Sequence, residues 1–151
     1  MEKITSNYSE TIDLGKSFAE EVLSSKKQKD KALIIALKGD LGAGKTTFMQ
    51  GFAQGLKIKD NILSPTFIIF NRYSLKLDKF KNLYHFDCYR IEKEEEVINL
   101  EFEEIISNKE NIVCIEWPKN IKGVIPEDAI FIKFNILEGD KRKIIIDYGE
   151  R

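Results

Sequence analysis

A glycine-rich loop carries the residues whose types and spacing best suit chemistry. The stretch Gly39-Asp40-Leu41-Gly42-Ala43-Gly44-Lys45-Thr46 matches the eight-position P-loop pattern. Its glycines allow a tight turn in which successive backbone N–H groups point at phosphate oxygens. Lys45 brings a positive charge to the β- and γ-phosphates, and Thr46 brings a hydroxyl to Mg²⁺. The loop therefore predicts binding of a nucleoside triphosphate together with magnesium.

Two acidic residues are candidates for the chemistry that such a loop requires. A P-loop NTPase needs a carboxylate near the magnesium and a group that positions the attacking water. Asp87 follows the apolar run 83–86, and Glu116 follows the run 112–115. Ligands of α/β sheets collect at the carboxyl ends of strands, where both side chains are expected. A solvated carboxylate at a strand exit is the alternative for each, and the P-loop favours the functional interpretation.

Three further residues remain open between a functional and a structural role, and a fourth is interpreted as structural. Thr66, between the P-loop helix and the next strand, could sense the γ-phosphate as switch threonines do, but its spacing alone favours a plain turn. Trp117 could pack on the sheet or flank the nucleotide, and Arg90 could contact phosphate or pair with nearby acids. His85, the only histidine, is interpreted as structural.

The elements that must position these residues alternate between helices and buried strands. Ser9 is expected to cap a helix that ends near Ser25. The apolar run 32–37 predicts a strand buried on both faces, and 46–55 predicts a helix after the loop. The segments 67–73 and 83–87 predict an antiparallel hairpin. Further along, 92–107 indicates one or two helical pieces, 112–115 a buried strand, and 130–137 with 143–148 a closing hairpin.

This pattern predicts an α/β fold, a P-loop NTPase-like three-layer sandwich. Its central sheet is expected to be mixed and mostly parallel, with antiparallel hairpins and with helices on its faces. The sequence shows no repeat, low-complexity tract or linker, and 151 residues suit one compact domain. We therefore expect a single P-loop domain over residues 1–151.

Composition narrows the class of protein. The formal net charge of −1 provides no global field for nucleic acid, so contact with RNA would need a local patch or a partner. Cys88 and Cys114 stand singly in apolar runs, which excludes a disulfide framework or a four-ligand zinc site within the chain. No apolar run approaches the roughly 18 residues of a membrane helix. A cytoplasmic protein with buried, reduced thiols and no membrane contact is expected.

Taken in order, four motifs resemble the bacterial TsaE (YjeE) family of tRNA threonylcarbamoyladenosine biosynthesis proteins. They are Gly39-Asp40-Leu41-Gly42-Ala43-Gly44-Lys45-Thr46-Thr47-Phe48, Ser64-Pro65-Thr66-Phe67, His85-Phe86-Asp87-Cys88-Tyr89-Arg90 and Glu116-Trp117-Pro118. The resemblance spans roughly residues 11–118. Four ordered motifs are far more specific than a P-loop alone.

The resemblance implies an ATPase that works with a TsaD-like catalytic subunit and a TsaB-like scaffold. Together these install threonylcarbamoyl on the adenosine next to the anticodon of tRNAs that read ANN codons, and the ATP cycle supports repeated turnover. It further implies ATP on residues 39–47 with Trp117 nearby. Thr46 and Glu116 would hold Mg²⁺, Asp87 would order the metal and the attacking water, and Thr66 would act as a switch threonine.

Two positions depart from the family's pattern. Family members often have a Leu-Gly pair before an acidic stretch, whereas Leu100 is followed here by Glu101. Asn99 tolerates the left-handed backbone that a glycine would supply. Cys88 stands where the family often has leucine, which is a conservative apolar change.

Other classes of P-loop protein remain alternatives. A small-molecule kinase usually closes a lid carrying several arginines, whereas this chain has only four, at 72, 90, 142 and 151, without a cluster. A nucleotide-dependent binding module with negligible hydrolysis is the non-enzymatic alternative. A GTPase is disfavoured because Asn108-Lys109-Glu110-Asn111 fails the guanine motif at its last position.

Overall fold

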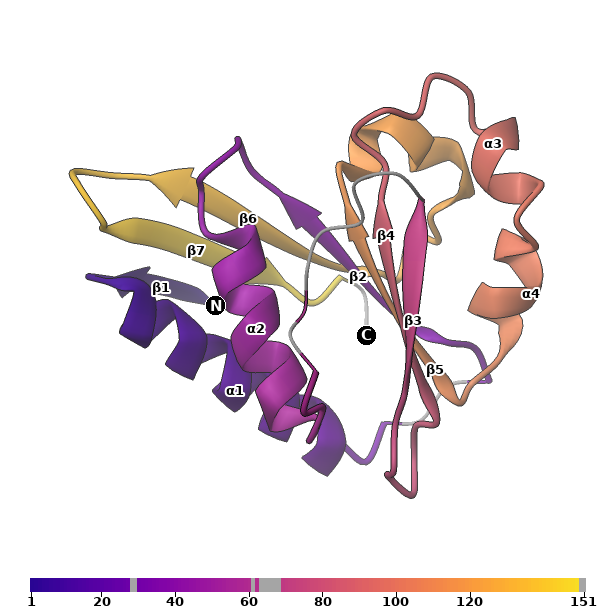
Figure 1. The fold of residues 1–151 in the computed structure, drawn as a ribbon, viewed down its shortest axis with the longest axis horizontal. Coiled ribbons are helices and arrows are strands. Elements are labelled where there is room, and N and C mark those ends of the chain that lie inside the picture. The colour runs from indigo at the N-terminus through magenta and orange to yellow at the C-terminus, as the bar shows by residue number, and fades with distance from the viewer. Residues whose placement is uncertain (28–29, 61, 63–68, 150–151) are drawn as a thin grey trace.

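A seven-stranded mixed sheet with helices on both faces forms the molecule (Figure 1). The computed structural model describes residues 1–27, 30–60, 62 and 69–149. The strands are β1 (Glu2–Thr5), β2 (Leu33–Lys38), β3 (Phe70–Ser74), β4 (Asn82–Asp87), β5 (Asn111–Glu116), β6 (Ile130–Ile136) and β7 (Arg142–Asp147). They lie in the order β1-β7-β6-β2-β5-β4-β3. The helices are α1 (Tyr8–Ser24), α2 (Lys45–Gly55), α3 (Glu95–Ile98), α4 (Phe102–Ser107) and the 3₁₀ segment η1 (Pro118–Val124).

The four central strands run parallel and the outer pairs are antiparallel. β6, β2, β5 and β4 pair in parallel, while β3 pairs antiparallel with β4, and β7 with both β6 and β1. The predicted α/β sandwich with antiparallel hairpins is confirmed. The hairpin expected from 67–73 and 83–87 is present as β3 and β4, and residues 67–68 lie outside the described part of the chain.

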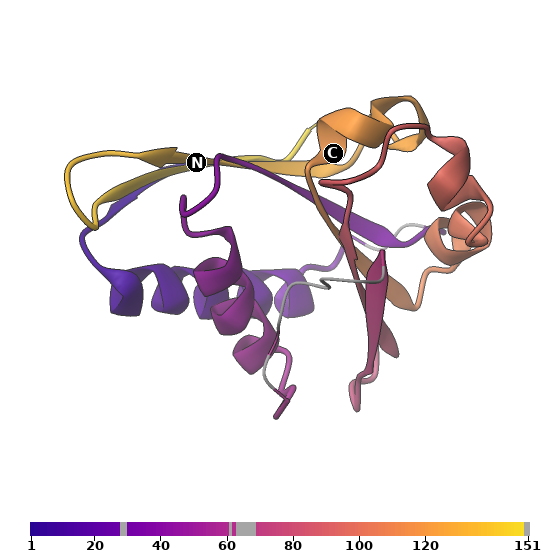
Figure 2. The ribbon, with the colours of Figure 1, turned by 45° about the horizontal axis from the view of Figure 1, so that its top comes forward.

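Alternating side chains of the central strands divide the core into two layers. Leu33, Ile35 and Leu37 of β2 pack in the cluster that includes residues of α1 and α2. Ile34, one position along, belongs to the cluster formed with α3, α4 and η1. In Figure 2, α1 and α2 lie on one side of the sheet, and η1 with α3 and α4 on the other. Because both faces are covered, β2 is a continuous apolar run, as parallel strands are.

Helix α1 begins two residues earlier than expected. Asn7 caps it, since the Asn7 Oδ1 accepts a hydrogen bond of 2.9 Å from the backbone N–H of Glu10. The expected cap, Ser9, lies inside the first turn. The carboxylate of Glu10 also accepts from the backbone N–H of Ser6 at 3.0 Å. Asn7, two residues before Ser9, is an equally favourable cap residue, and the sequence alone does not distinguish between the two.

The acidic segment 92–107 forms the two short helices α3 and α4. The residue with a left-handed backbone in this segment is not the expected one. Asn99 has a right-handed backbone with φ −67°, so the expectation of a left-handed Asn99 is wrong. Glu101, the residue after Leu100, takes φ 63° immediately before α4. The position where a Leu-Gly pair would place glycine therefore carries a side chain in the left-handed region.

Both cysteines are buried and free, as expected. Burial raises the pKa of the Cys88 thiol to about 12, which keeps it protonated and unreactive at neutral pH. Across the described ranges, none of the helices combines the length and apolarity that a membrane crossing needs.

Candidate functional site

The P-loop connects β2 to α2 with the backbone that its glycines permit. Gly42 has φ 79° and Gly44, which precedes the first residue of α2, has φ 102°. These left-handed values are accessible to glycine at little cost and strain other residues. The turn is closed by a hydrogen bond of 3.1 Å from the Ala43 N–H to the Asp40 carbonyl. The free N–H groups at the start of α2 and the helix dipole favour an anion at this position.

Lys45 is a buried cation at the base of the loop. Its side chain is only slightly exposed, its Nζ donates to the Gly39 carbonyl, and the same atom lies 4.1 Å from the centroid of the Trp117 ring. Burial lowers the pKa of Lys45, and the nearby charges of Glu116, Asp87 and Asp40 oppose this shift. A desolvated ammonium beside an aromatic face is suited to receiving a phosphate, whose negative charge compensates the burial of the cation.

Asp87 and Glu116 meet at one edge of the sheet because their strands are parallel neighbours. Each is the last residue of its strand, and the two are directly paired in the β4–β5 register. Glu116 is also paired with Leu37 of β2, two residues before Gly39. The sheet thus places both carboxylates beside the loop.

The two carboxylates differ in their surroundings. Asp87 is half-buried, and burial raises its pKa despite a 3.0 Å hydrogen bond from the Tyr89 N–H to its Oδ1. Glu116 is 3% exposed, and its Oε2 lies 2.8 Å from Nε2 of the fully buried His85. His85 Nδ1 is buried without a hydrogen-bond partner in the described part of the chain. His85, interpreted from the sequence as structural, therefore contacts a predicted site residue directly.

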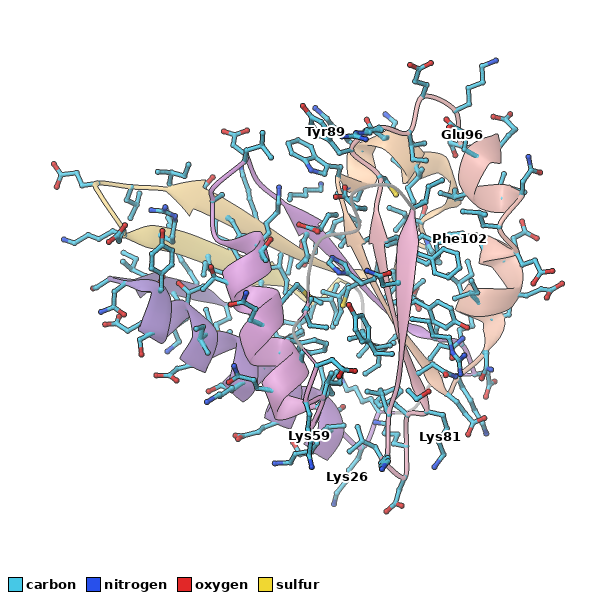
Figure 3. All side chains as sticks on the ribbon, in the orientation of Figure 1. Lys26, Lys59, Lys81, Tyr89, Glu96 and Phe102 are labelled. Carbon is cyan, nitrogen blue, oxygen red and sulfur yellow. The ribbon has the colours of Figure 1, made fainter. Side chains whose placement is uncertain are left out.

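A pocket of about 510 Å³ joins these residues. Its lining includes Leu41 to Thr47, Asp87, Glu116 and Trp117, all of them predicted site residues. The lining also contains residues that sequence reasoning did not commit to: Tyr8, Ile69, Tyr89, Arg90, Ile91 and Glu96. The side chains of Tyr89 and Glu96 are labelled in Figure 3 at the end of the molecule where η1 and α3 lie. A volume of this size is in the range of small-ligand sites.

The ring of Trp117 forms one wall of the pocket. Trp117 takes a left-handed backbone with φ 59°, and its ring centroid lies 5.0 Å from that of Tyr89. An exposed Tyr8 from the start of α1 lines the pocket as well. Aromatic side chains thus approach the loop from two separate parts of the chain.

The oxygen donors of the site fit a magnesium ion shared with phosphates. Thr46, Asp87 and Glu116 offer one hydroxyl and two carboxylates to the same pocket. Among the described residues there is no group of three or more His, Cys, Asp or Glu that could hold a metal alone. Mg²⁺ in nucleotide sites typically uses one or two carboxylates plus substrate phosphates and water, so the donor set suits it.

Two predicted residues, Gly39 and Asp40, are not among the described lining residues of the pocket. The Gly39 carbonyl accepts the Lys45 hydrogen bond, and Asp40 acts on Lys45 through its charge. Thr66 lies outside the described residues. Arg142 of β7, which no sequence motif singles out, reaches the loop and donates to the Gly42 carbonyl at 3.0 Å.

Comparison with known proteins gives consistent matches. The family model described as "Threonylcarbamoyl adenosine biosynthesis protein TsaE" matches residues 5–144. The TsaE protein of Haemophilus influenzae is 38% identical over 135 residues, covering 88% of this chain and 80% of that protein. The TsaE protein of Rickettsia prowazekii is 39% identical over 128 residues, covering 84% and 83%. The crystal structure of YdiB from Bacillus subtilis is similar with a TM-score of 0.75 and 30% identity, covering 100% of this chain and 87% of that one.

Proposed function

Because the chain belongs to the TsaE family of threonylcarbamoyl adenosine biosynthesis proteins, we propose that it is the ATPase supporting formation of N6-threonylcarbamoyladenosine in tRNA. Its relatives from Haemophilus influenzae and Rickettsia prowazekii are named for this pathway. One observation supports the ATPase activity above all. The P-loop lysine and two strand-end carboxylates line the same pocket, so phosphate binding and water activation share one site.

In this proposal the P-loop and the side chains around it bind ATP. The backbone N–H groups from Gly42 to Thr47 cradle the phosphates, and Lys45 leaves the Gly39 carbonyl to contact the β- and γ-phosphates. Trp117 is proposed to lie near the nucleotide, and Tyr8 lines the same pocket. Phosphate binding to Lys45 contributes to affinity, because the negative charge of the phosphates compensates the burial of its ammonium group.

The magnesium site is assigned to Thr46 and Glu116, directly or through water. The chemistry that Mg²⁺ supplies when bound is neutralisation of the charge that develops on the β- and γ-phosphate oxygens. Glu116 is held in place by His85, so its carboxylate is oriented before nucleotide arrives. Asp87, at the end of the neighbouring strand β4, provides the second carboxylate beside this site.

Hydrolysis transfers the γ-phosphoryl group to water. The water oxygen bonds to the γ-phosphorus, the bond from that phosphorus to the β–γ bridging oxygen breaks, and ADP leaves. Asp87 orders the water and accepts its hydrogen bond. Its raised pKa makes it a better proton acceptor than an ordinary aspartate, which suits this role.

The proposed partners are a TsaD-like catalytic subunit and a TsaB-like scaffold. In this proposal the two partners modify the adenosine next to the anticodon of tRNAs that read ANN codons, and ATP hydrolysis resets the complex for further turnovers. Thr66 is proposed as the switch threonine that couples the γ-phosphate to the partners. The reaction is proposed to take place in the cytoplasm.

The arginines argue against a small-molecule kinase. Arg90 is the one arginine among the described lining residues of the pocket. Arg72 lies on β3, where its Nε donates to Asn82, and Arg142 is engaged with carbonyls of the loop and of its own hairpin. A lid built from several arginines is absent from the described residues, so transfer of phosphate to water is favoured over transfer to a small molecule.

The test is phosphate release from ATP by the purified chain, alone and with the two partner proteins. Slow release that rises with the partners and disappears in Glu116→Ala is expected. Nucleotide affinity of Glu116→Ala, measured by calorimetry, should fall much less than hydrolysis does. Glu138→Ala in the β6–β7 turn is the matched control and should behave as the unchanged protein. Absence of stimulation by folded partners would contradict the proposed pathway, and an unaffected Glu116→Ala would contradict the proposed site.

A further inference from the structure

Three connections that are far apart in sequence meet at the end of the molecule opposite the P-loop. Their described residues are 26–27 and 30–31 before β2, 57–60 after α2, and 76–81 between β3 and β4. In Figure 3 the labelled Lys26, Lys59 and Lys81, one from each connection, lie together at this end. A hydrogen bond of 2.8 Å from Lys79 Nζ to the carbonyl of Ser25, the C-cap of α1, joins the third connection to the residue directly before the first. We call the described residues of these three connections the lysine surface.

The lysine surface carries a concentrated positive charge. Its described residues contain eight lysines and three aspartates, although the whole chain has a formal net charge of −1. Lys26, Lys31, Lys59 and Lys76 are exposed. The fold therefore brings these lysines together into a local positive field, which the net charge of the whole chain does not indicate.

Stabilisation of helix ends explains only some of the lysines on the lysine surface. Lysines near the last turn of a helix interact favourably with its dipole, and the ends of α1 and α2 lie here. That reason covers Lys26, Lys27 and Lys57, and also Lys79, whose Nζ donates to the carbonyl of Ser25, the C-cap of α1. It does not cover Lys31, which precedes β2, or Lys76 and Lys81, which lie next to strands.

The chemistry of the surface fits a phosphate backbone better than a protein. Protein interfaces are depleted in lysine and have an aromatic or apolar centre. The large apolar side chains that the described residues expose, such as Tyr8, Leu41 and Ile136, lie outside the lysine surface. Lysine ammonium groups bind phosphates as point charges and release counterions without reading bases.

We propose that the lysine surface binds the phosphate backbone of RNA without sequence preference. The eleven residues of α2 separate the P-loop from Lys57 by about 16 Å along the helix, so RNA bound here leaves the nucleotide pocket open. The choice of tRNA as the physiological RNA rests on the proposed function, whereas the charge argument does not.

The test is binding of a fluorescently labelled tRNA transcript to the nucleotide-free chain by fluorescence anisotropy, over about 20 to about 200 mM salt. The variant combines Lys26→Gln, Lys59→Gln and Lys76→Gln. The control combines Lys3→Gln, Lys122→Gln and Lys133→Gln, which are also exposed and change the net charge equally. Loss of three phosphate contacts should weaken binding at least about tenfold at low salt and reduce the salt slope by about three. The control triple should stay within about twofold of the unchanged chain.

Two further measurements separate this proposal from the ATPase proposal. The lysine-surface triple should retain basal ATP hydrolysis, and Lys45→Ala should retain RNA binding. A folded chain that does not bind tRNA at the lowest salt would overturn the RNA proposal, as would equal losses in the two triples. Stronger competition by polyglutamate than by polyadenylate of equal charge would also overturn it, in favour of an acidic protein partner.

Discussion

His85 Nε2 lies 2.8 Å from Glu116 Oε2, and both side chains are shielded from solvent. Because His85 Nδ1 has no hydrogen-bond partner in the described structure, a proton there would be unsatisfied. The ring therefore contacts the carboxylate through Nε2, the one of its two nitrogens with a described partner. The pairing spans adjacent strands, since His85 is in register with Cys114, two residues before Glu116. The contact fixes the orientation of the carboxylate assigned to magnesium.

The first prediction concerns this positioning contact. In His85→Gln the amide nitrogen reaches about as far as Nε2 and should keep the contact, whereas the shorter side chain in His85→Asn should not. We expect His85→Asn to lower kcat by about tenfold to a hundredfold and to require more Mg²⁺, with His85→Gln much less affected. Magnesium titrations of ATP hydrolysis measure the effect. Equal magnesium dependence in both variants would reduce His85 to a structural residue.

The second prediction concerns Lys45 and the only tryptophan. Since Lys45 Nζ lies 4.1 Å from the Trp117 ring, withdrawal of Lys45 toward phosphates should change the tryptophan emission when ATP binds. Lys45→Ala should abolish that change and weaken ATP binding more than about tenfold, because burial of the phosphates loses its compensating charge. Lys38→Ala, an exposed lysine of β2, is the control and should bind normally. Normal ATP binding and turnover by Lys45→Ala would disprove the P-loop assignment.

The third prediction follows from the raised pKa of Asp87. Its charged form is disfavoured in the fold, so its cost to stability is absent below the ordinary aspartate pKa. The cost of the charge to stability increases as pH rises from the ordinary aspartate pKa to the raised pKa of the folded state, and it is fully present above the latter. Asp87→Asn should therefore raise the melting temperature of the nucleotide-free chain at neutral pH, and the gain should shrink as pH is lowered.

The same variant should lose magnesium-dependent hydrolysis, so stability and activity move in opposite directions. Thermal unfolding at several pH values and phosphate release measure the two effects. Asp13→Asn, an exposed aspartate of α1, should change neither quantity. A pH-independent gain in stability would mean that the Asp87 charge is not its cause.

The fourth prediction concerns the tie between the β6–β7 turn and the P-loop. The Arg142 guanidinium donates to the Gly42 carbonyl at 3.0 Å and to the Gly139 carbonyl at 2.8 Å. Its loss should loosen the loop before nucleotide binds, so Arg142→Ala should raise KM for ATP by about threefold to tenfold and change kcat little. Arg72→Ala on β3 removes an arginine far from the loop and should leave KM unchanged. A fall in kcat alone would assign Arg142 to the reaction itself.

The sequence was sufficient for the parts of the site that depend on local pattern. The P-loop is recognisable because its glycines, lysine and threonine are contiguous and follow a buried strand. The convergence of Asp87 and Glu116 followed from one rule, that the carboxyl ends of parallel strands meet at one edge. These predictions needed element types and strand direction, but no register.

Features that depend on pairing between distant segments were not predictable. β1 has four residues, most of them exposed, and it is a strand because it pairs with β7 near the other end of the chain. The contact of His85 with Glu116 requires the exact β4–β5 register, and the contact of Arg142 with Gly42 requires the position of the closing hairpin. A single sequence carries no local signal for either contact.

The last prediction tests the backbone at Glu101. Its φ of 63° lies in the left-handed region, which costs a residue with a side chain about 1–2 kcal/mol, and its side chain caps no helix N–H. Glu101→Gly removes that strain but gives the unfolded chain more freedom, so a net stabilisation of about 0.5–1 kcal/mol is expected. Glu103→Gly, in the first turn of α4, is the matched control and should destabilise by about 1 kcal/mol, because glycine is a poor helix residue. Urea unfolding of both variants gives the comparison. Similar destabilisation in the two would show that Glu101 is not strained in solution.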